Sequence, residues 1–296
     1  MFKPEGIIAA IVTPMTADER INESELRSQV NRQIDAGVHG IFCIGTNGEN
    51  YILTQDEKLE IIRIVVDENK GRLPIYAGTG CIGTRETIEL SRKAKEIGAD
   101  VLSIITPYFA AISQDELYIH FKTVAEAVDL PLVLYNIPAR TGNSLDYTTV
   151  AKLASISNIV GIKDSSGNFD NILRYIEATD RKTFTVLSGN DSLILWTLLA
   201  GGTGGISGIA NLFPKTMVKI YESWKKGDIT GAKTAQDSIR PIRDCLKLGN
   251  PNSIVKKAVN ILGYPVGLCK KPFDMVNEKV ETEIKRVLDT YYRDVQ

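Results

Sequence analysis

The sequence is poor in the residues that build metal centres and disulfide frameworks. Its 296 residues include four cysteines and two histidines, and no two cysteines stand in a Cys-x-x-Cys pair. This pattern excludes a disulfide-rich secreted scaffold, and so few ligand candidates make a zinc cluster unexpected. We therefore expect a protein without a metal site. The residues concerned are Cys43, Cys81, Cys245, Cys269, His39 and His120.

An excess of one charge and long apolar runs are also missing. The formal net charge is −1, so no basic surface for nucleic acid or anionic membrane stands out. The longest apolar runs, such as residues 130–134, are far shorter than the roughly 20 residues that span a bilayer. Residues 1–6 lack the apolar core of a signal peptide. We expect a cytoplasmic protein with no nucleic-acid and no membrane partner.

The chain does have the composition of a globular α/β protein, with 43% hydrophobic and 24% charged residues. Through three quarters of the sequence, short β-branched runs alternate with helical patterns, which is typical of a parallel α/β fold. The predicted strands cover residues 6–14, 40–45, 74–80, 100–107, 130–138, 158–164, 183–190 and 204–211.

Between the strands, apolar residues recur at helical spacing. In residues 23–36 they stand four positions apart and share one helix face. Clear capping boxes occur at residues 54–57 and 113–116, and a looser one at 22–25. The glycines expected where helices end are Gly37, Gly98 and Gly201.

Eight strands, each followed by a helix, predict an α/β fold of the (β/α)8 TIM-barrel type instead of a doubly wound sheet. The eighth helix is expected at residues 213–226, so the barrel would occupy residues 1–227. Residues 228–296 show helical patterns only, and we interpret them as a C-terminal helical subdomain packed on the barrel. Its helices are predicted at about 230–248, 253–262 and 277–292.

In such a barrel, functional residues gather where the loops after the strands meet. Lys163 stands there, near the end of the apolar run 158–164. Burying a charged amine is costly, and an apolar pocket can lower the pKa of a lysine by several units. The deprotonated amine is the nucleophile that Schiff-base chemistry on a carbonyl requires. The alternative is that this lysine is exposed or ion-paired.

Further candidates stand at other strand ends. Thr46 lies in the turn of residues 45–48, whose N–H groups could bind a carboxylate or simply join a strand to a helix. Tyr135 ends the fifth strand, where a phenol can relay protons to a carbonyl oxygen or belong to the core. Arg140 offers a forked donor to a carboxylate, or is a solvated loop residue. The ends of the last two strands add Gly189 and Ile206.

The segment Gly78–Gly83 fits the pattern GxGxxG, which follows a strand in dinucleotide-binding folds. Such a site also needs an acidic residue at the end of the next strand, whereas Asp100 begins that strand. We therefore expect these glycines to form a tight turn and not a dinucleotide site.

Four motifs connect the chain with a known superfamily. They are GTNGE at 45–49, TPYF at 106–109, YNIPARTG at 135–142 and GIKDSSGN at 161–168. The chain resembles the dihydrodipicolinate synthase / N-acetylneuraminate lyase superfamily of class I, pyruvate-dependent lyases and aldolases, from Gly6 to the C-terminal helices. The resemblance implies a homotetramer that uses neither a metal nor an organic cofactor.

By this resemblance, Lys163 corresponds to the lysine that forms the Schiff base with pyruvate. Tyr135 corresponds to the proton-relay tyrosine, and Thr46 to its hydrogen-bonding partner. Thr46 and Asn47 correspond to the pair that binds the pyruvate carboxylate. Arg140 corresponds to the arginine with which synthase members bind the carboxylate of aspartate semialdehyde.

The chain departs from the usual synthase pattern at two positions. Synthase members usually have Thr-Thr where this chain has Thr46 and Asn47, and two tyrosines where it has Tyr108 and Phe109. The second of those tyrosines normally lends a hydroxyl to the relay of a neighbouring subunit. Either Tyr108 or water would replace that hydroxyl here, or the acceptor chemistry differs.

The resemblance therefore implies a lyase that captures pyruvate or another 2-oxo acid as an imine and joins it to an aldehyde, or catalyses the reverse cleavage. Arg140 favours 4-hydroxy-tetrahydrodipicolinate synthase chemistry, because sialic-acid lyases and sugar-acid aldolases of the superfamily generally lack an arginine at this position. The alternatives are an aldolase for 2-keto-3-deoxy sugar acids, an N-acetylneuraminate lyase, and a non-catalytic barrel that binds a 2-oxo acid.

Overall fold

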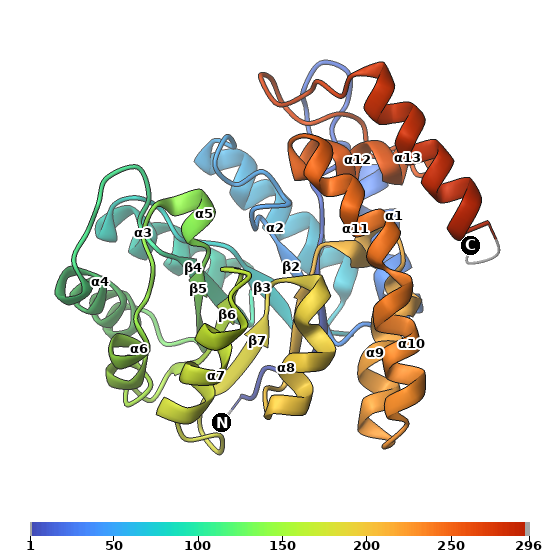
Figure 1. The fold of residues 1–296 in the computed structure, drawn as a ribbon. Coiled ribbons are helices and arrows are strands. Elements are labelled where there is room, and N and C mark those ends of the chain that lie inside the picture. Colours follow the sequence, from blue (N-terminus) through green and yellow to red (C-terminus); the bar gives the residue numbers. More distant parts are fainter. Residues whose placement is uncertain (1, 294–296) are drawn as a thin grey trace.

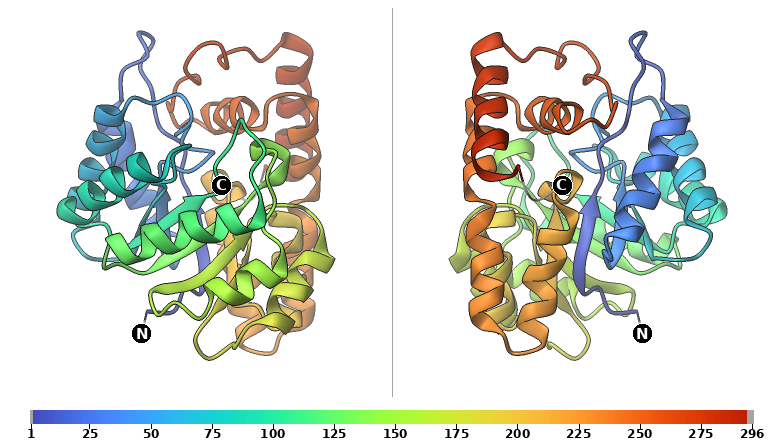
Figure 2. Two further views of the ribbon diagram at one scale, coloured as in Figure 1. Left: turned by 90° about the vertical axis from the view of Figure 1, so that its left-hand side faces the viewer. Right: turned by 90° about the vertical axis from the view of Figure 1, so that its right-hand side faces the viewer.

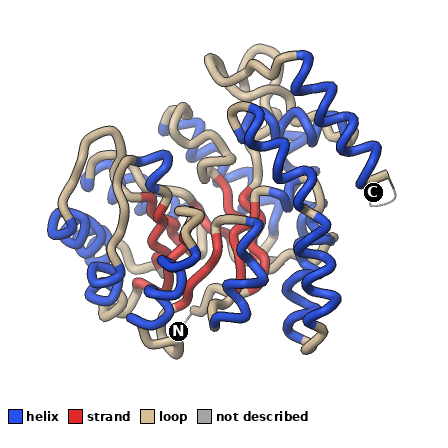
Figure 3. The backbone as a smooth tube through the Cα atoms, viewed as in Figure 1, coloured by secondary structure: helices blue, strands red, loops and turns tan. Residues whose placement is uncertain are grey.

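A computed structural model describes residues 2–293, in which eight parallel strands form a closed barrel (Figure 1). The strands pair in sequence order, and the last one pairs with the first. They gather in the centre of the molecule, with helices around them (Figure 3). The strands are β1 (Gly6–Ala10), β2 (Gly40–Cys43), β3 (Ile75–Ala77), β4 (Val101–Ile105), β5 (Leu132–Asn136), β6 (Ile159–Asp164), β7 (Thr185–Ser188) and β8 (Gly204–Ser207).

The predicted (β/α)8 barrel is confirmed, and each strand lies inside its predicted range. Most of the strands end before the predicted boundary, because the chain leaves the sheet and turns toward the next helix. The residues of the eight strands are buried, as expected for a parallel sheet that is covered on its outer face and packed inside.

The barrel helices are amphipathic, and several begin at the predicted caps. The Thr54 and Ser113 side chains each form a capping box with a glutamate three residues later. The Asn22 side chain accepts the N–H of Glu25 without a reciprocal bond from that glutamate. The helices are α1 (Glu23–Asp35), α2 (Gln55–Asn69), α3 (Thr84–Ile97), α4 (Gln114–Ala127), α5 (Pro138–Thr141), α6 (Tyr147–Leu153), α7 (Phe169–Ala178), α8 (Ile194–Ala200) and α9 (Pro214–Lys225).

The buried hydrophobic residues that the structure describes form two clusters, one on each face of the sheet. The larger cluster lies between the sheet and the helices. The smaller one contains Phe42, Val133, Leu187 and Ile206, which come from β2, β5, β7 and β8 and fill the barrel interior. The inside of the barrel is thus a packed apolar core and not a pore.

The C-terminal part is helical, as predicted, but the single helix expected at residues 230–248 is wrong. The structure has α10 (Ile229–Ser238) and α11 (Arg240–Cys245), with Pro241 in the first turn of α11. Proline has no N–H for the i−4 carbonyl and its ring crowds that turn, so one helix ends and another begins. Further along are α12 (Pro251–Ile261) and α13 (Glu278–Tyr291).

The C-terminal helices extend from the side of the barrel to one of its ends. Helix α10 packs along α9, and α11, α12 and α13 continue from it over the barrel end that also carries α5 (Figures 1 and 2). The domain boundary at residue 228 stays a prediction. Among the helices within residues 2–293, not one combines the length and the apolar character needed to cross a bilayer.

His120 on α4 is a buried histidine. Its side chain meets Thr84 through Nδ1 at 2.9 Å, and Nε2 has no hydrogen-bond partner among the described residues. Burial lowers the pKa of His120 from 6.5 to about 4. The unfolded chain therefore binds a proton more readily than the folded protein between these two pH values.

Folding stability should accordingly fall as the pH drops from about 6.5 to about 4, and His120 should contribute up to about 3 kcal/mol to this loss. Urea unfolding at several pH values measures this pH dependence of the free energy of unfolding. The variant His120→Gln, which stays neutral throughout, should show a flatter dependence in this window. Identical slopes for both proteins would contradict the assignment.

Candidate active site

The pairing of β5 with β6 brings the lysine and the tyrosine of the candidate site together. In this parallel ladder Tyr135 is the register partner of Lys163. Paired residues of neighbouring strands point to the same face, so both side chains enter the barrel interior near the carboxyl ends of the strands. Each residue is only 4% exposed. The prediction that Lys163 is buried is therefore confirmed.

The amine of Lys163 lies against aromatic rings. Its Nζ is 3.8 Å from the ring centroid of Tyr135 and 5.0 Å from that of Phe42. The face of an aromatic ring attracts a cation, which offsets part of the cost of leaving water. Within residues 2–293, no carboxylate forms an ion pair with this amine.

The Tyr135 phenol is bonded to the loop after β2. Its hydroxyl lies 3.2 Å from Thr46 Oγ1, at hydrogen-bonding distance. Burial raises the pKa of Tyr135, but the neighbouring Lys163 charge and hydrogen bonds with Thr46, Lys163 and Ser165 outweigh this effect. The pKa of Tyr135 is thus held below its ordinary value, so the phenolate is easier to form.

The turn that carries Thr46 leaves three N–H groups free. Hydrogen bonds from Glu49 N to the Thr46 carbonyl and from Asn50 N to the Gly45 carbonyl close it. Within the described part of the chain, the N–H groups of residues 46–48 donate to no protein acceptor. An anion at this turn would find free donors.

Most of the predicted site residues line one cavity of 250 Å³. The loops after five strands contribute to it, as expected for the mouth of a barrel. The residues predicted from the sequence that line it are Thr46, Asn47, Tyr135, Arg140, Lys163, Gly189 and Ile206.

The two remaining candidates lie elsewhere. Tyr108 lines an adjoining cavity of 270 Å³, which shares Thr46 and Arg140 with the first. Burial raises the pKa of Tyr108. Phe109 lines neither cavity: it is 97% exposed and adopts a positive φ of 81°. That backbone conformation is unfavourable for a bulky residue, so Phe109 is held outward at a cost.

Arg140 stands in the short helix α5, a helix that the sequence did not predict. Its residue is exposed, and among residues 2–293 no acidic side chain pairs with it. A guanidinium that borders both cavities without a protein carboxylate is available to a carboxylate ligand.

Several residues that line the 250 Å³ cavity were not predicted. Ser165 follows β6, whereas Arg243 and Asn252 come from α11 and α12 in the C-terminal helices. Ser165 could have been found from its position two residues after Lys163. No local signal marks Arg243 or Asn252, because only the packing of the C-terminal helices brings them to the barrel mouth.

Two glycines of the segment Gly78–Gly83 have a packing role. A Cβ on Gly78 would clash with the Ile44 carbonyl, and a Cβ on Gly80 would lie 2.7 Å from the backbone nitrogen of Ile105. Close approach of neighbouring strand ends therefore explains them. Within residues 2–293, no three His, Cys, Asp or Glu side chains are grouped as a metal site would require.

A buried amine beside a phenol, at the mouth of a (β/α)8 barrel, defines a Schiff-base lyase of the aldolase type. Comparison with known proteins identifies the family. The sequence profile of the Dihydrodipicolinate synthetase family matches residues 3–291. The chain belongs to this family of pyruvate-dependent Schiff-base lyases.

Curated relatives and solved structures match this chain over nearly its whole length. The 4-hydroxy-tetrahydrodipicolinate synthase of Methanopyrus kandleri is 42% identical over 289 residues, which are 97% of this chain and 96% of the relative. That of Methanoculleus marisnigri is 39% identical, over 96% of this chain and 98% of the relative. A dihydrodipicolinate synthase structure from Bacillus anthracis superposes with a TM-score of 0.94 at 32% identity, covering 98% and 99% of the two chains.

Proposed function

We propose that this protein is a 4-hydroxy-tetrahydrodipicolinate synthase that condenses pyruvate with aspartate semialdehyde. Curated relatives at 35–42% identity carry the name of this synthase. The observation that carries the proposal is that the Lys163 amine and the Arg140 guanidinium border the same 250 Å³ cavity. A 2-oxo acid and a second carboxylate-bearing substrate can thus be bound next to each other.

The first step is capture of pyruvate by Lys163. The amine attacks the C2 carbonyl, and loss of water from the carbinolamine gives the imine. The ammonium must first lose a proton, and the carbonyl oxygen must gain protons before it leaves as water. Tyr135 can do both as a proton relay, because its pKa is lowered and its hydroxyl bonds to Thr46.

The second step forms the carbon–carbon bond. The imine withdraws electrons from C3, which loses a proton and becomes an enamine carbon. This carbon attacks the aldehyde of aspartate semialdehyde, and the aldehyde oxygen becomes a hydroxyl. The amino group of the second substrate can then attack C2, which closes a six-membered ring and releases the Lys163 amine.

The two carboxylates need separate binding groups. The free N–H groups of the turn at Thr46 and Asn47, together with the Thr46 hydroxyl, suit the pyruvate carboxylate. The unpaired guanidinium of Arg140 suits the carboxylate of the semialdehyde. Gly189 and Ile206, which also border the cavity, would contact the substrates.

A second candidate is an aldolase for 2-keto-3-deoxy sugar acids or N-acetylneuraminate. It is favoured by Asn47 and Phe109, which differ from the usual synthase residues. Because Phe109 has no hydroxyl, Tyr108 or water would complete the proton relay in either reaction. Assays of pyruvate with a panel of aldehydes distinguish the two candidates.

A homotetramer is part of the proposal, and two exposed apolar surfaces support it. One is the Phe109 loop, and the other is a shallow hollow formed by Phe169, Trp196 and Leu199 on α7 and α8. A tetramer with dihedral symmetry needs two such self-complementary interfaces.

The variant Trp196→Glu should reduce the tetramer to a smaller species in light scattering, because it places a charge in the apolar hollow on α7 and α8. An unchanged mass would contradict the role of this surface. A cytoplasmic location stays a prediction.

The variant Lys163→Ala should abolish the covalent adduct that borohydride traps in the presence of pyruvate. The reason is that the amine which forms the imine is removed. Mass spectrometry of the intact protein measures the adduct. Lys93→Ala, at an exposed lysine of α3, serves as the control and should be trapped like the wild type. Reversible pyruvate binding without an adduct in the wild type would indicate a non-catalytic barrel instead.

The variant Arg140→Ala should weaken the use of aspartate semialdehyde much more than the capture of pyruvate. One charged hydrogen-bonding interaction contributes about 1.5–3 kcal/mol, so kcat/KM for the semialdehyde should fall by about 10- to 150-fold. Steady-state kinetics and borohydride trapping measure the two steps. Equal losses in both would remove the reason for preferring the synthase.

A further inference from the structure

Helix α12 contacts the loop of residues 45–50 that carries Thr46. The side-chain amide of Asn252 donates to the Thr46 carbonyl at 2.7 Å and to the Tyr51 hydroxyl at 3.1 Å. Both N–H bonds of this amide are thereby used within the protein. Although Asn252 borders the cavity, its donors act on the loop and not on a ligand.

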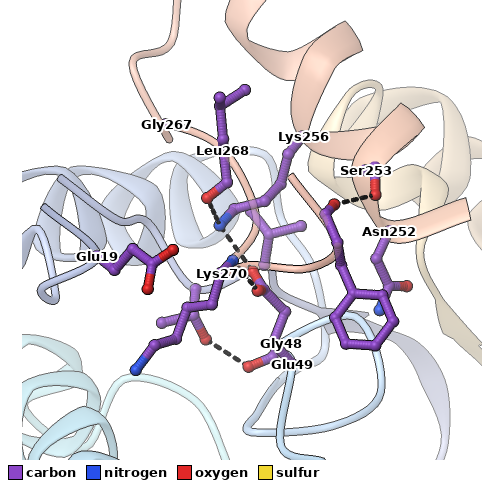
Figure 4. Close-up of polar contacts among 12 residues, drawn as sticks. Glu19, Gly48, Glu49, Asn252, Ser253, Lys256, Gly267, Leu268 and Lys270 are labelled. Atoms are coloured by element: carbon purple, nitrogen blue, oxygen red, sulfur yellow. Dashed lines mark hydrogen bonds and ion pairs between the residues drawn. The ribbon is translucent and has the colours of Figure 1, made fainter. Parts of the chain in front are cut away.

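One turn further along α12, Lys256 forms an ion pair with Glu49 of the same loop. Lys256 Nζ lies 2.7 Å from Glu49 Oε1, and neither side chain is exposed to solvent. The same amine donates to the Leu268 carbonyl at 2.7 Å, and Glu49 Oε2 accepts the backbone N–H of Lys270 at 2.8 Å. Figure 4 shows the lysine amine between the carbonyl and the carboxylate.

The loop is bonded from the barrel side as well. Thr13 Oγ1 donates to the Gly48 carbonyl at 2.7 Å. Glu49 has a positive φ of 62°, and its N–H also donates to the Thr46 carbonyl, at 3.1 Å. The carbonyl of Thr46 thus accepts one hydrogen bond from its own loop and one from α12.

A buried ion pair is by itself weak evidence for a stabilising role. Its desolvation penalty can equal its Coulombic gain, and well-packed apolar residues often replace such a pair without loss of stability. Apolar residues cannot, however, reproduce the directional hydrogen bonds of the pair. A charged pair in which both carboxylate oxygens are bonded holds its two segments in one register. Here the two segments are α12 and the loop whose threonine meets the Tyr135 phenol.

We propose that Asn252, Glu49 and Lys256 are positioning residues, through which α12 holds Thr46 so that its hydroxyl bonds to Tyr135. The inference rests on the proposed function, since it assigns a role to the C-terminal helices in the proton relay of that reaction. Misplacing a group of the relay by about 1 Å can slow a reaction by up to about 100-fold.

The test uses the full-length protein and follows imine formation with saturating pyruvate, quenched by borohydride at different times. Mass spectrometry gives two quantities: the fraction of sites that react and the rate constant of those that do. Asn252→Ala should keep most sites reactive but lower the rate constant by between about tenfold and 100-fold. The isosteric Asn252→Asp, which also lacks the donor, should do the same.

Lys256→Met should slow imine formation as well. Its matched control is Lys257→Met, which removes the neighbouring ion pair of α12 with Glu281 at 2.9 Å but no contact to the loop. This control should keep the wild-type rate constant. The kcat/KM for aspartate semialdehyde should stay within about twofold in the Asn252 variants, because Arg140 lies on α5 and not on α12.

The outcomes distinguish a positioning role of α12 from a role in stability alone. A wild-type rate constant in Asn252→Ala, with only fewer reactive sites or a lower melting temperature, would mean that α12 merely stabilises the fold. Equal slowing by Lys257→Met would also overturn the positioning role. A wild-type protein that forms no adduct would instead contradict the proposed function. If Lys256→Met does not fold, the Asn252 variants decide.

Discussion

The free-energy cost of burying a charged amine shapes this structure, because residues 2–293 include two buried lysines at the same end of the barrel. Lys256 is fully buried, and its amine is bonded to the Glu49 carboxylate and to a carbonyl. Lys163 is 4% exposed but faces aromatic rings, with no carboxylate partner within residues 2–293. The paired amine of Lys256 connects two segments of the chain, whereas the amine of Lys163, beside a phenol at the cavity, is available to a carbonyl substrate. The chemistry of the site follows from this difference.

The phenol matters as much as the lysine, and its properties depend on parts of the chain far apart in sequence. Strand pairing aligns Tyr135 with Lys163, and the loop after β2 supplies the hydroxyl of Thr46. That loop is bonded on one side to Thr13 and on the other to α12. The C-terminal helices are thus hydrogen-bonded to a loop of the active site, although the (β/α)8 fold itself consists of the barrel alone.

The sequence was sufficient for the barrel because its eight apolar runs and intervening amphipathic segments are local patterns. It also marked Lys163, Tyr135 and Arg140, since strand ends converge in any such barrel. It could not reveal Asn252 or Arg243, which reach the cavity only when α11 and α12 pack over the mouth. The helix predicted across Pro241 was wrong, because the periodic pattern continued through a residue that cannot continue the hydrogen-bond ladder.

The structure gives the glycines at the barrel mouth a packing role that the sequence did not reveal. A Cβ on Gly189 would lie 2.8 Å from Lys163 Cε, and one on Gly208 would lie 2.7 Å from Asn47 Nδ2. A Cβ on Gly45 would lie 2.6 Å from Phe42 Cε1, in the ring that faces the amine. Each position leaves room for a longer side chain that borders the cavity or contacts Lys163. Since a dense core offers no spare volume, these glycines leave the space that Lys163, Asn47 and Phe42 occupy.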